Sequence, residues 1–84
     1  MARMTKEEME KYADKKPIAV YPMSNWGGIE ILDIEHGIDD YAICRYNFGE
    51  PEKKIHRIKI KSGASVDYIM VDGTYVRLDD CIRV

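Results

Sequence analysis

The sequence predicts a mainly β protein, a small SH3-like antiparallel barrel of five to six strands with a short N-terminal helix. Three observations predict it. The chain has 84 residues, which is enough for one domain with a modest core. Short apolar runs separated by tight turns follow one another after Pro17. A single 3₁₀ turn is expected at 78–80, before the last run. Residues 1–16 are therefore read as a helical extension and 17–84 as one small β-barrel domain.

The N-terminal helix has a clear start and a clear stop. Thr5 followed by Glu8 is the spacing of a capping box, in which each residue satisfies a backbone amide of the other. Pro17 forbids continuation of the helix. A helix this short is not stable alone, so we expect its apolar stripe, which contains Met9 and Tyr12, to dock on another surface.

The strands are read from runs of apolar and β-branched residues between turns. In the second run the apolar residues change faces near Leu32 and Asp33, which predicts either a β-bulge or a strand that is apolar on both faces. Asp72-Gly73 lies between two alternating runs, the pattern of a two-residue type I′ hairpin. The expected strands are 18–21, 28–35, 41–48, 54–61, the two arms of the hairpin at 67–78, and 81–84.

The two faces of that hairpin differ in character. A two-residue loop places Ile69, Val71, Thr74 and Val76 on one face, which reads as core. The other face carries Tyr68, Met70, Tyr75 and Arg77, and Tyr, Met and Arg are enriched at the centres of protein interfaces. Two interpretations stay open: a contact surface for a partner, or a surface that the N-terminal helix covers.

Charge is sorted along the chain although the net charge is only −2. Residues 17–52 contain seven acids and one base, whereas residues 53–61 contain five bases and no acid. The acids are expected to crowd the hairpin around residues 30–40, as a second contact surface for a basic partner or as one half of a head-to-tail homo-oligomer. These residues are Glu30, Asp33, Glu35, Asp39 and Asp40.

The basic segment supports an alternative function, a nucleic-acid-binding accessory domain. If 54–61 is one strand, Arg57, Lys59 and Lys61 share a face at steps of about 6.6–6.8 Å, near the interval between phosphates, and Lys54 begins the same strand. Binding would then depend strongly on salt. The competing interpretation is that these charges protect an edge strand from aggregation.

Catalytic and metal-binding patterns are missing from the sequence. No Ser or Cys stands in a nucleophile motif, and Cys44 and Cys81 have no metal-ligand spacing with His36 or His56. We therefore expect a protein that is not an enzyme, with no cofactor and no metal. The two cysteines are read as reduced and apolar in character, although a disulfide between them stays open.

The expected location is the cytoplasm. The first sixteen residues are charged throughout, so they contain no secretory apolar region. No apolar run approaches the roughly 18 residues that span a bilayer, so no membrane contact is expected.

The single tryptophan, Trp26, stands beside Gly27-Gly28 in a loop before the second strand. A small domain with one Trp and one Phe can hardly leave this ring unused. We expect it to cover one end of the barrel, packed on glycine backbone. The other interpretation is an exposed anchor for a partner.

One resemblance adds a genomic setting. The block "YPMSNWGGIEILDIEHGIDDYAICRYNFGEPEKKIHRIKI" and the closing "YVRLDDCIRV" resemble small uncharacterised proteins of bacterial prophages and mobile elements. The resemblance carries over no site residue. It implies a small protein that binds and inhibits a host protein, as anti-CRISPR and other anti-defence proteins do. The leading hypothesis is thus a cytoplasmic protein-binding module with a host or phage protein as partner.

Overall fold

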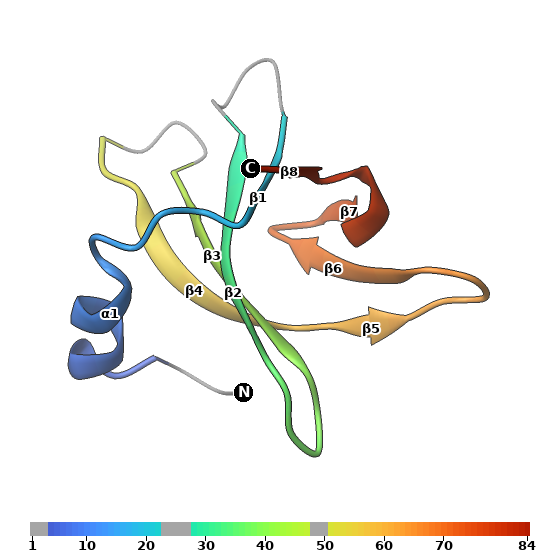
Figure 1. Ribbon diagram of the computed structural model, residues 1–84, viewed down its shortest axis with the longest axis horizontal. Coiled ribbons are helices and arrows are strands. Elements are labelled where there is room, and N and C mark those ends of the chain that lie inside the picture. The colour runs from blue at the N-terminus through green and yellow to red at the C-terminus, as the bar shows by residue number, and fades with distance from the viewer. Residues whose placement is uncertain (1–3, 23–27, 48–50) are drawn as a thin grey trace.

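Two antiparallel sheets and one short helix make up the structure, a computed structural model that describes residues 4–22, 28–47 and 51–84. Five strands form what we call the large sheet, in the order β4-β3-β2-β1-β8 (Figure 1). Their bounds are β1 Ala19–Tyr21, β2 Ile29–Glu35, β3 Tyr41–Tyr46, β4 Lys54–Lys59 and β8 Ile82–Arg83.

Three strands form the small sheet, in the order β5-β6-β7. They are β5 Lys61–Ser62, β6 Asp67–Val71 and β7 Thr74–Arg77, and a 3₁₀ turn, η1 Leu78–Asp80, leads from β7 to β8. Asp72 and Gly73 both have positive φ, 47° and 83°, which is what a type I′ turn requires. The predicted hairpin, its four residue pairs and the 3₁₀ turn are confirmed.

The change of face in β2 is a β-bulge. The register between β2 and β3 passes from Ile31 opposite Cys44 to Asp33 opposite Ile43, so Leu32 is the extra residue. Leu32 faces the side opposite Ile31, as neighbours in a strand do, and the bulge returns Ile34 to the side on which Ile31 is buried. As a result, the large sheet is apolar on both faces in its middle.

The main core lies between the two sheets. The inner side of the hairpin contributes Ile69, Val71 and Val76, all fully buried. They pack against buried residues of the large sheet, which are Ile29, Ile31, Ala42, Cys44 and Tyr46. The predicted core face of the hairpin is therefore confirmed for three of its four residues, and the fourth, Thr74, is half-buried at the turn.

Helix α1, Lys6–Tyr12, begins with the predicted capping box. The Thr5 amide donates to Glu8 Oε1 at 3.1 Å, and the Glu8 amide donates to Thr5 Oγ1 at 3.2 Å. Tyr12, together with Met4, packs against Leu32 and Ile43 on the face of the large sheet opposite the small sheet (Figure 1). Met9 stays 41% exposed, so Tyr12 and not the whole predicted stripe makes this contact.

Two expectations about the strands are wrong in detail. The described strands form two separate ladders and not one closed barrel, because β7 pairs only with β6, and β8 only with β1. The predicted strand 54–61 is interrupted at Ile60, whose amide donates to the Asp40 carbonyl at 2.8 Å. At that point the chain leaves the large sheet and enters the small one.

Candidate functional site

The outer side of the small sheet is the strongest candidate site, and we call it the hairpin face. Cross-strand register brings Lys61, Tyr68 and Arg77 into one row across β5, β6 and β7. Met70 and Tyr75 form the next row. Because side chains alternate along a strand, all five point away from the core that Ile69, Val71 and Val76 fill.

The hairpin face is open. Met70 is 39% exposed and Tyr75 47% exposed, although both are large apolar side chains. The helix that was expected as a cover packs on the large sheet instead, through Tyr12. Of the two interpretations of this face, the covered one is therefore wrong.

The two tyrosines of the hairpin face lie against each other. The Tyr68 and Tyr75 ring centroids are 4.8 Å apart and the rings are tilted by 36°. Lys61 and Arg77 stand on either side of Tyr68 in its row. The only ion pair that the structure gives to these two cations, within its described residues, joins Arg77 to Asp80 at 3.9 Å. Sequence reasoning assigned Lys61 to a different surface, because it treated 54–61 as one strand.

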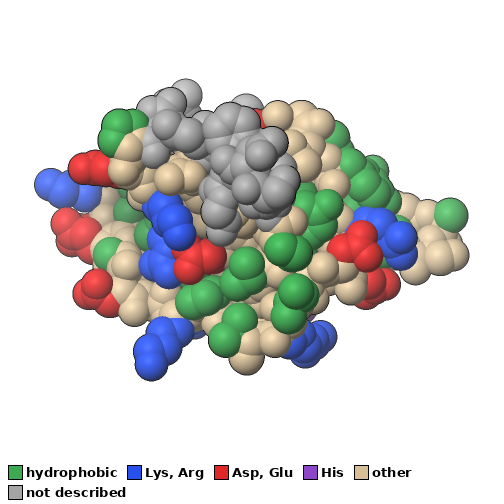
Figure 2. All heavy atoms as spheres, turned by 90° about the horizontal axis from the view of Figure 1, so that it is seen from above, with side chains coloured by type: hydrophobic (Ala, Val, Ile, Leu, Met, Phe, Trp, Pro, Cys, Tyr) green, Lys and Arg blue, Asp and Glu red, His purple; other side chains and the backbone are tan. Residues whose placement is uncertain are grey.

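A second exposed apolar group lies on β1 and β8. Ile18, Ile82 and Val84 are 45%, 62% and 83% exposed, and the Val84 amide donates to the Ile18 carbonyl at 3.2 Å. Hydrophobic side chains also gather in groups on the end of the molecule that Figure 2 shows, between charged ones. The exposed apolar side chains of the β1–β8 group are all aliphatic, whereas aromatic residues and Arg dominate binding energy at interfaces, so we rank this group below the hairpin face.

The acidic residues do not form a free acidic surface, because each has a basic neighbour. Glu30 receives bonds from Arg45 Nε and Nη2, both at 3.0 Å, and from Lys53 at 3.3 Å. The other pairs are Asp33 with Lys15 at 3.7 Å, Glu35 with Arg57 at 2.7 Å, Asp39 with Lys59 at 3.6 Å and Asp40 with His36 at 3.4 Å. The antiparallel meander places the acidic β2 and the basic β4 on either side of β3, so charges sorted in sequence are paired in space.

The basic residues do not share one face either. Arg57 and Lys59 lie on the face of the large sheet that carries α1, whereas Lys61 belongs to the small sheet. Lys54, which stands opposite Tyr46, lies on the other face from Arg57. The predicted row of phosphate-spaced cations is therefore wrong, because the chain changes sheets at Ile60.

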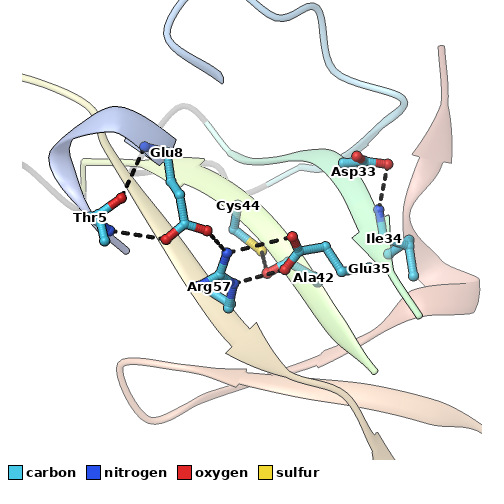
Figure 3. A network of polar contacts seen from close by, with 8 residues as sticks. All are labelled: Thr5, Glu8, Asp33, Ile34, Glu35, Ala42, Cys44 and Arg57. Atoms are coloured by element: carbon cyan, nitrogen blue, oxygen red, sulfur yellow. Dashed lines mark hydrogen bonds and ion pairs between the residues drawn. The ribbon is translucent and has the colours of Figure 1, made fainter. Parts of the chain in front are cut away.

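Arg57 forms ion pairs with two carboxylates. Its side chain is only 12% exposed, and its guanidinium donates to Glu8 on α1 and to Glu35 on β2 (Figure 3). The bond from Arg57 holds the pKa of Glu8 below its usual value, and the two carboxylates raise the pKa of Arg57. Arg57 therefore fixes the helix to the sheet and is not available to a phosphate.

Cys44 is buried in the core, whereas His56 and Cys81 are half-buried. The His56 ring stacks on Tyr46 at 4.6 Å, and burial lowers the pKa of His56 from 6.5. Burial also raises the pKa of Cys44 to about 12, so this thiol stays protonated at neutral pH. Cys44 and Cys81 are both free thiols. Among the described residues no three His, Cys, Asp or Glu side chains are grouped to hold a metal ion.

Two further predictions concerned the Trp26 ring and the membrane. Trp26 lies outside the described residues, so neither interpretation of its ring is tested. In the described part of the chain, no helix has the length and apolar character needed to cross a membrane.

Comparisons with known proteins found no relative of this chain. No protein-family model, no curated protein and no solved structure matches it.

Proposed function

We propose that this protein is a small non-enzymatic protein-binding module whose contact site is the hairpin face. The observation that carries the proposal is the open arrangement of Tyr68, Met70, Tyr75 and Arg77 on one rigid side of the small sheet. Large apolar and aromatic side chains that are exposed, contiguous and bordered by polar residues mark interaction surfaces.

The chemistry of the face fits a protein partner. The tilted tyrosine pair offers a broad apolar contact whose rotamers are already restrained by packing, so little entropy is lost on binding. Arg77 and Lys61 border the rings, where they favour a partner with acidic groups around an apolar centre.

The proposed biological role is inhibition of a host protein in the cytoplasm by a protein of a phage or mobile element, with anti-defence activity of the anti-CRISPR kind as one form. The support is the prophage resemblance of the sequence together with small size and the open hairpin face. The 3₁₀ turn between β7 and β8 and the two sheets around one core also support a relationship to SH3-like domains, many of which bind peptides or proteins.

A second candidate is single-stranded nucleic acid, and one observation favours it. The row Lys61, Tyr68, Arg77 sets an aromatic ring between two cations, and the adjacent Tyr75 extends the aromatic surface. Bases stack on such rings while cations hold the backbone. This site replaces the one expected on the 54–61 strand.

One affinity experiment tests both candidates. The immobilised protein is exposed to lysate of the source cell with and without nuclease, beside the variant Met70→Ala/Tyr75→Ala. We expect capture of a specific protein that survives nuclease and is lost in the variant. Capture that disappears with nuclease and falls steeply with salt would support the nucleic-acid candidate instead.

The matched control is Ile82→Ala/Val84→Ala, which removes apolar side chains that are more exposed and lie on β8 and directly after it. It should leave capture intact. Capture lost in the control but kept in the hairpin variant would move the contact site to the β1–β8 group and contradict the proposal.

A further inference from the structure

β7 lies at one edge of the small sheet, and no other described strand pairs with that edge. Natural edge strands carry lysines, prolines or bulges, or are very short, so that they do not pair with other chains. β4 carries Lys54 and Lys59, β5 carries Lys61, and β8 has two residues. β7, with the sequence Thr-Tyr-Val-Arg, has no lysine, proline or bulge, and its one charged side chain is Arg77.

The hydrogen-bonding groups of β7 that face outward are those of Tyr75 and Arg77. In a two-residue hairpin the residues flanking the turn, Val71 and Thr74, form a hydrogen-bonded pair, and bonded and non-bonded pairs then alternate. Tyr75 opposite Met70 is a non-bonded pair, so its N–H and C=O point away from β6. Among the described residues, the outward side of β7 receives only the weak bond from Cys81 Sγ to the Arg77 carbonyl, at 3.6 Å.

We propose that β7 pairs with β7 of a second copy of this chain, antiparallel and about a two-fold axis at Val76. The two small sheets then form one six-stranded sheet. In this register Tyr75 stands opposite Arg77 of the partner subunit, and Arg77 opposite the partner's Tyr75. A two-fold contact of this kind is closed, so it produces a dimer and no longer chain.

This register gives hydrogen-bond partners to the outward-facing backbone groups of both β7 strands. It pairs both outward-facing residues with each other, which gives the four backbone bonds that the two edges can make. It also sets each guanidinium beside a tyrosine ring on the same face, a favourable cation–π arrangement. Centring the pairing on Tyr75 leaves Arg77 opposite the turn, and centring it on Arg77 sets two like charges opposite each other.

Edge pairing leaves the hairpin face open and joins two copies of it side by side. The dimer therefore goes beyond the proposed function without depending on it, because self-association is measured on the purified chain with no partner present. A contact confined to two four-residue strands is small, so we expect weak association.

The test is sedimentation equilibrium of the full chain from about 10 µM to about 1 mM, a range chosen for a contact of this small size. The wild-type protein should shift from monomer to dimer, and amide exchange of Tyr75 and Arg77 should slow by at least about threefold as the dimer forms. A monomer at every concentration, or exchange at these two amides that does not depend on concentration, would overturn the proposal.

Two substitutions at one position test the register. Tyr75→Arg sets like charges opposite each other and should abolish the dimer, whereas Tyr75→Glu sets a carboxylate opposite the partner's Arg77 and should keep it. The double variant Tyr75→Arg/Arg77→Glu should restore dimerisation. Equal behaviour of the two single variants, with circular dichroism showing both folded, would contradict the register; should either fail to fold, the wild-type exchange measurement still decides.

Discussion

The guanidinium of Arg57 on β4 donates to the carboxylate of Glu8 on α1, 49 positions earlier in the chain. Glu8 thereby serves twice, because its other oxygen accepts the Thr5 amide of the capping box. The side chain that caps the start of the helix therefore also fixes the helix to the large sheet. With the helix held there by Arg57 and Tyr12, the helix does not cover the hairpin face.

The first prediction concerns this ion pair. Arg57→Gln should lower the free energy of unfolding by about 1–2 kcal/mol, because bonds to charged groups contribute more than neutral ones while partial solvent exposure of the carboxylates limits the gain. The measurement is chemical denaturation. Lys54→Gln is the matched control, since Lys54 is exposed on the same strand, and it should stay within about 0.5 kcal/mol of wild type. Equal losses in both variants would contradict the role assigned to Arg57.

The second prediction concerns helix docking. Tyr12 is 3% exposed and Tyr75 47% exposed, so the same substitution at both sites separates buried from open surface. Tyr12→Ala should lower the free energy of unfolding by about 3 kcal/mol, as large-to-small changes in a core do, and Tyr75→Ala by less than about 1 kcal/mol. A larger loss at Tyr75 than at Tyr12 would mean that the hairpin face is the covered one.

Local signals in the sequence were enough to predict much of the fold. The capping box of Thr5 and Glu8, the Asp72-Gly73 turn and the bulge at Leu32 each depend on residues a few positions apart, so tertiary structure does not alter them. The hairpin register followed from the turn alone.

The errors have a common cause, which is that they depend on contacts between distant segments. The sorted charges looked like two surfaces, yet β2 and β4 flank β3, and Glu35 of β2 pairs with Arg57 of β4. The helix had two apolar surfaces on which to dock, and one signal could have chosen between them. Leu32 lies on the same face as Ile43, and this apolar strip on the large sheet needed a cover.

The third prediction concerns acid stability. Burial lowers the pKa of His56 below 6.5, so the unfolded chain takes up this proton first, and stability should begin to fall as the pH drops below about 6.5. Bonds from Arg57 and Arg45 lower the pKa values of Glu8 and Glu30 below 4.5. Their contribution is present above that pH and is lost as the pH falls further.

Urea denaturation across this pH range measures both steps. His56→Phe, which keeps a ring against Tyr46, should remove the upper step and leave the lower one. An upper step that persists unchanged in this variant would contradict the assignment to His56.

The fourth prediction concerns the hairpin turn. Gly73 has φ +83°, where a side chain is strained even though nothing lies within 4 Å of the added carbon. Gly73→Ala should therefore cost about 1 kcal/mol of stability. Gly37→Ala is the control, because Gly37 does not have positive φ and the added carbon would stay 3.5 Å from its nearest neighbour. Thermal unfolding of the two variants should differ, and equal midpoints would contradict the type I′ assignment.

The central claim, that the hairpin face is the site of partner binding, is tested most directly by site-specific photo-crosslinking. A photoreactive phenylalanine is placed at Tyr75 in one protein and at Val84, which is 83% exposed on the β1–β8 group, in another. Both are irradiated in lysate of the source cell, and the products are identified by mass spectrometry. We predict one specific adduct from position 75 and none of that protein from position 84. The same adduct from position 84 alone would contradict the claim.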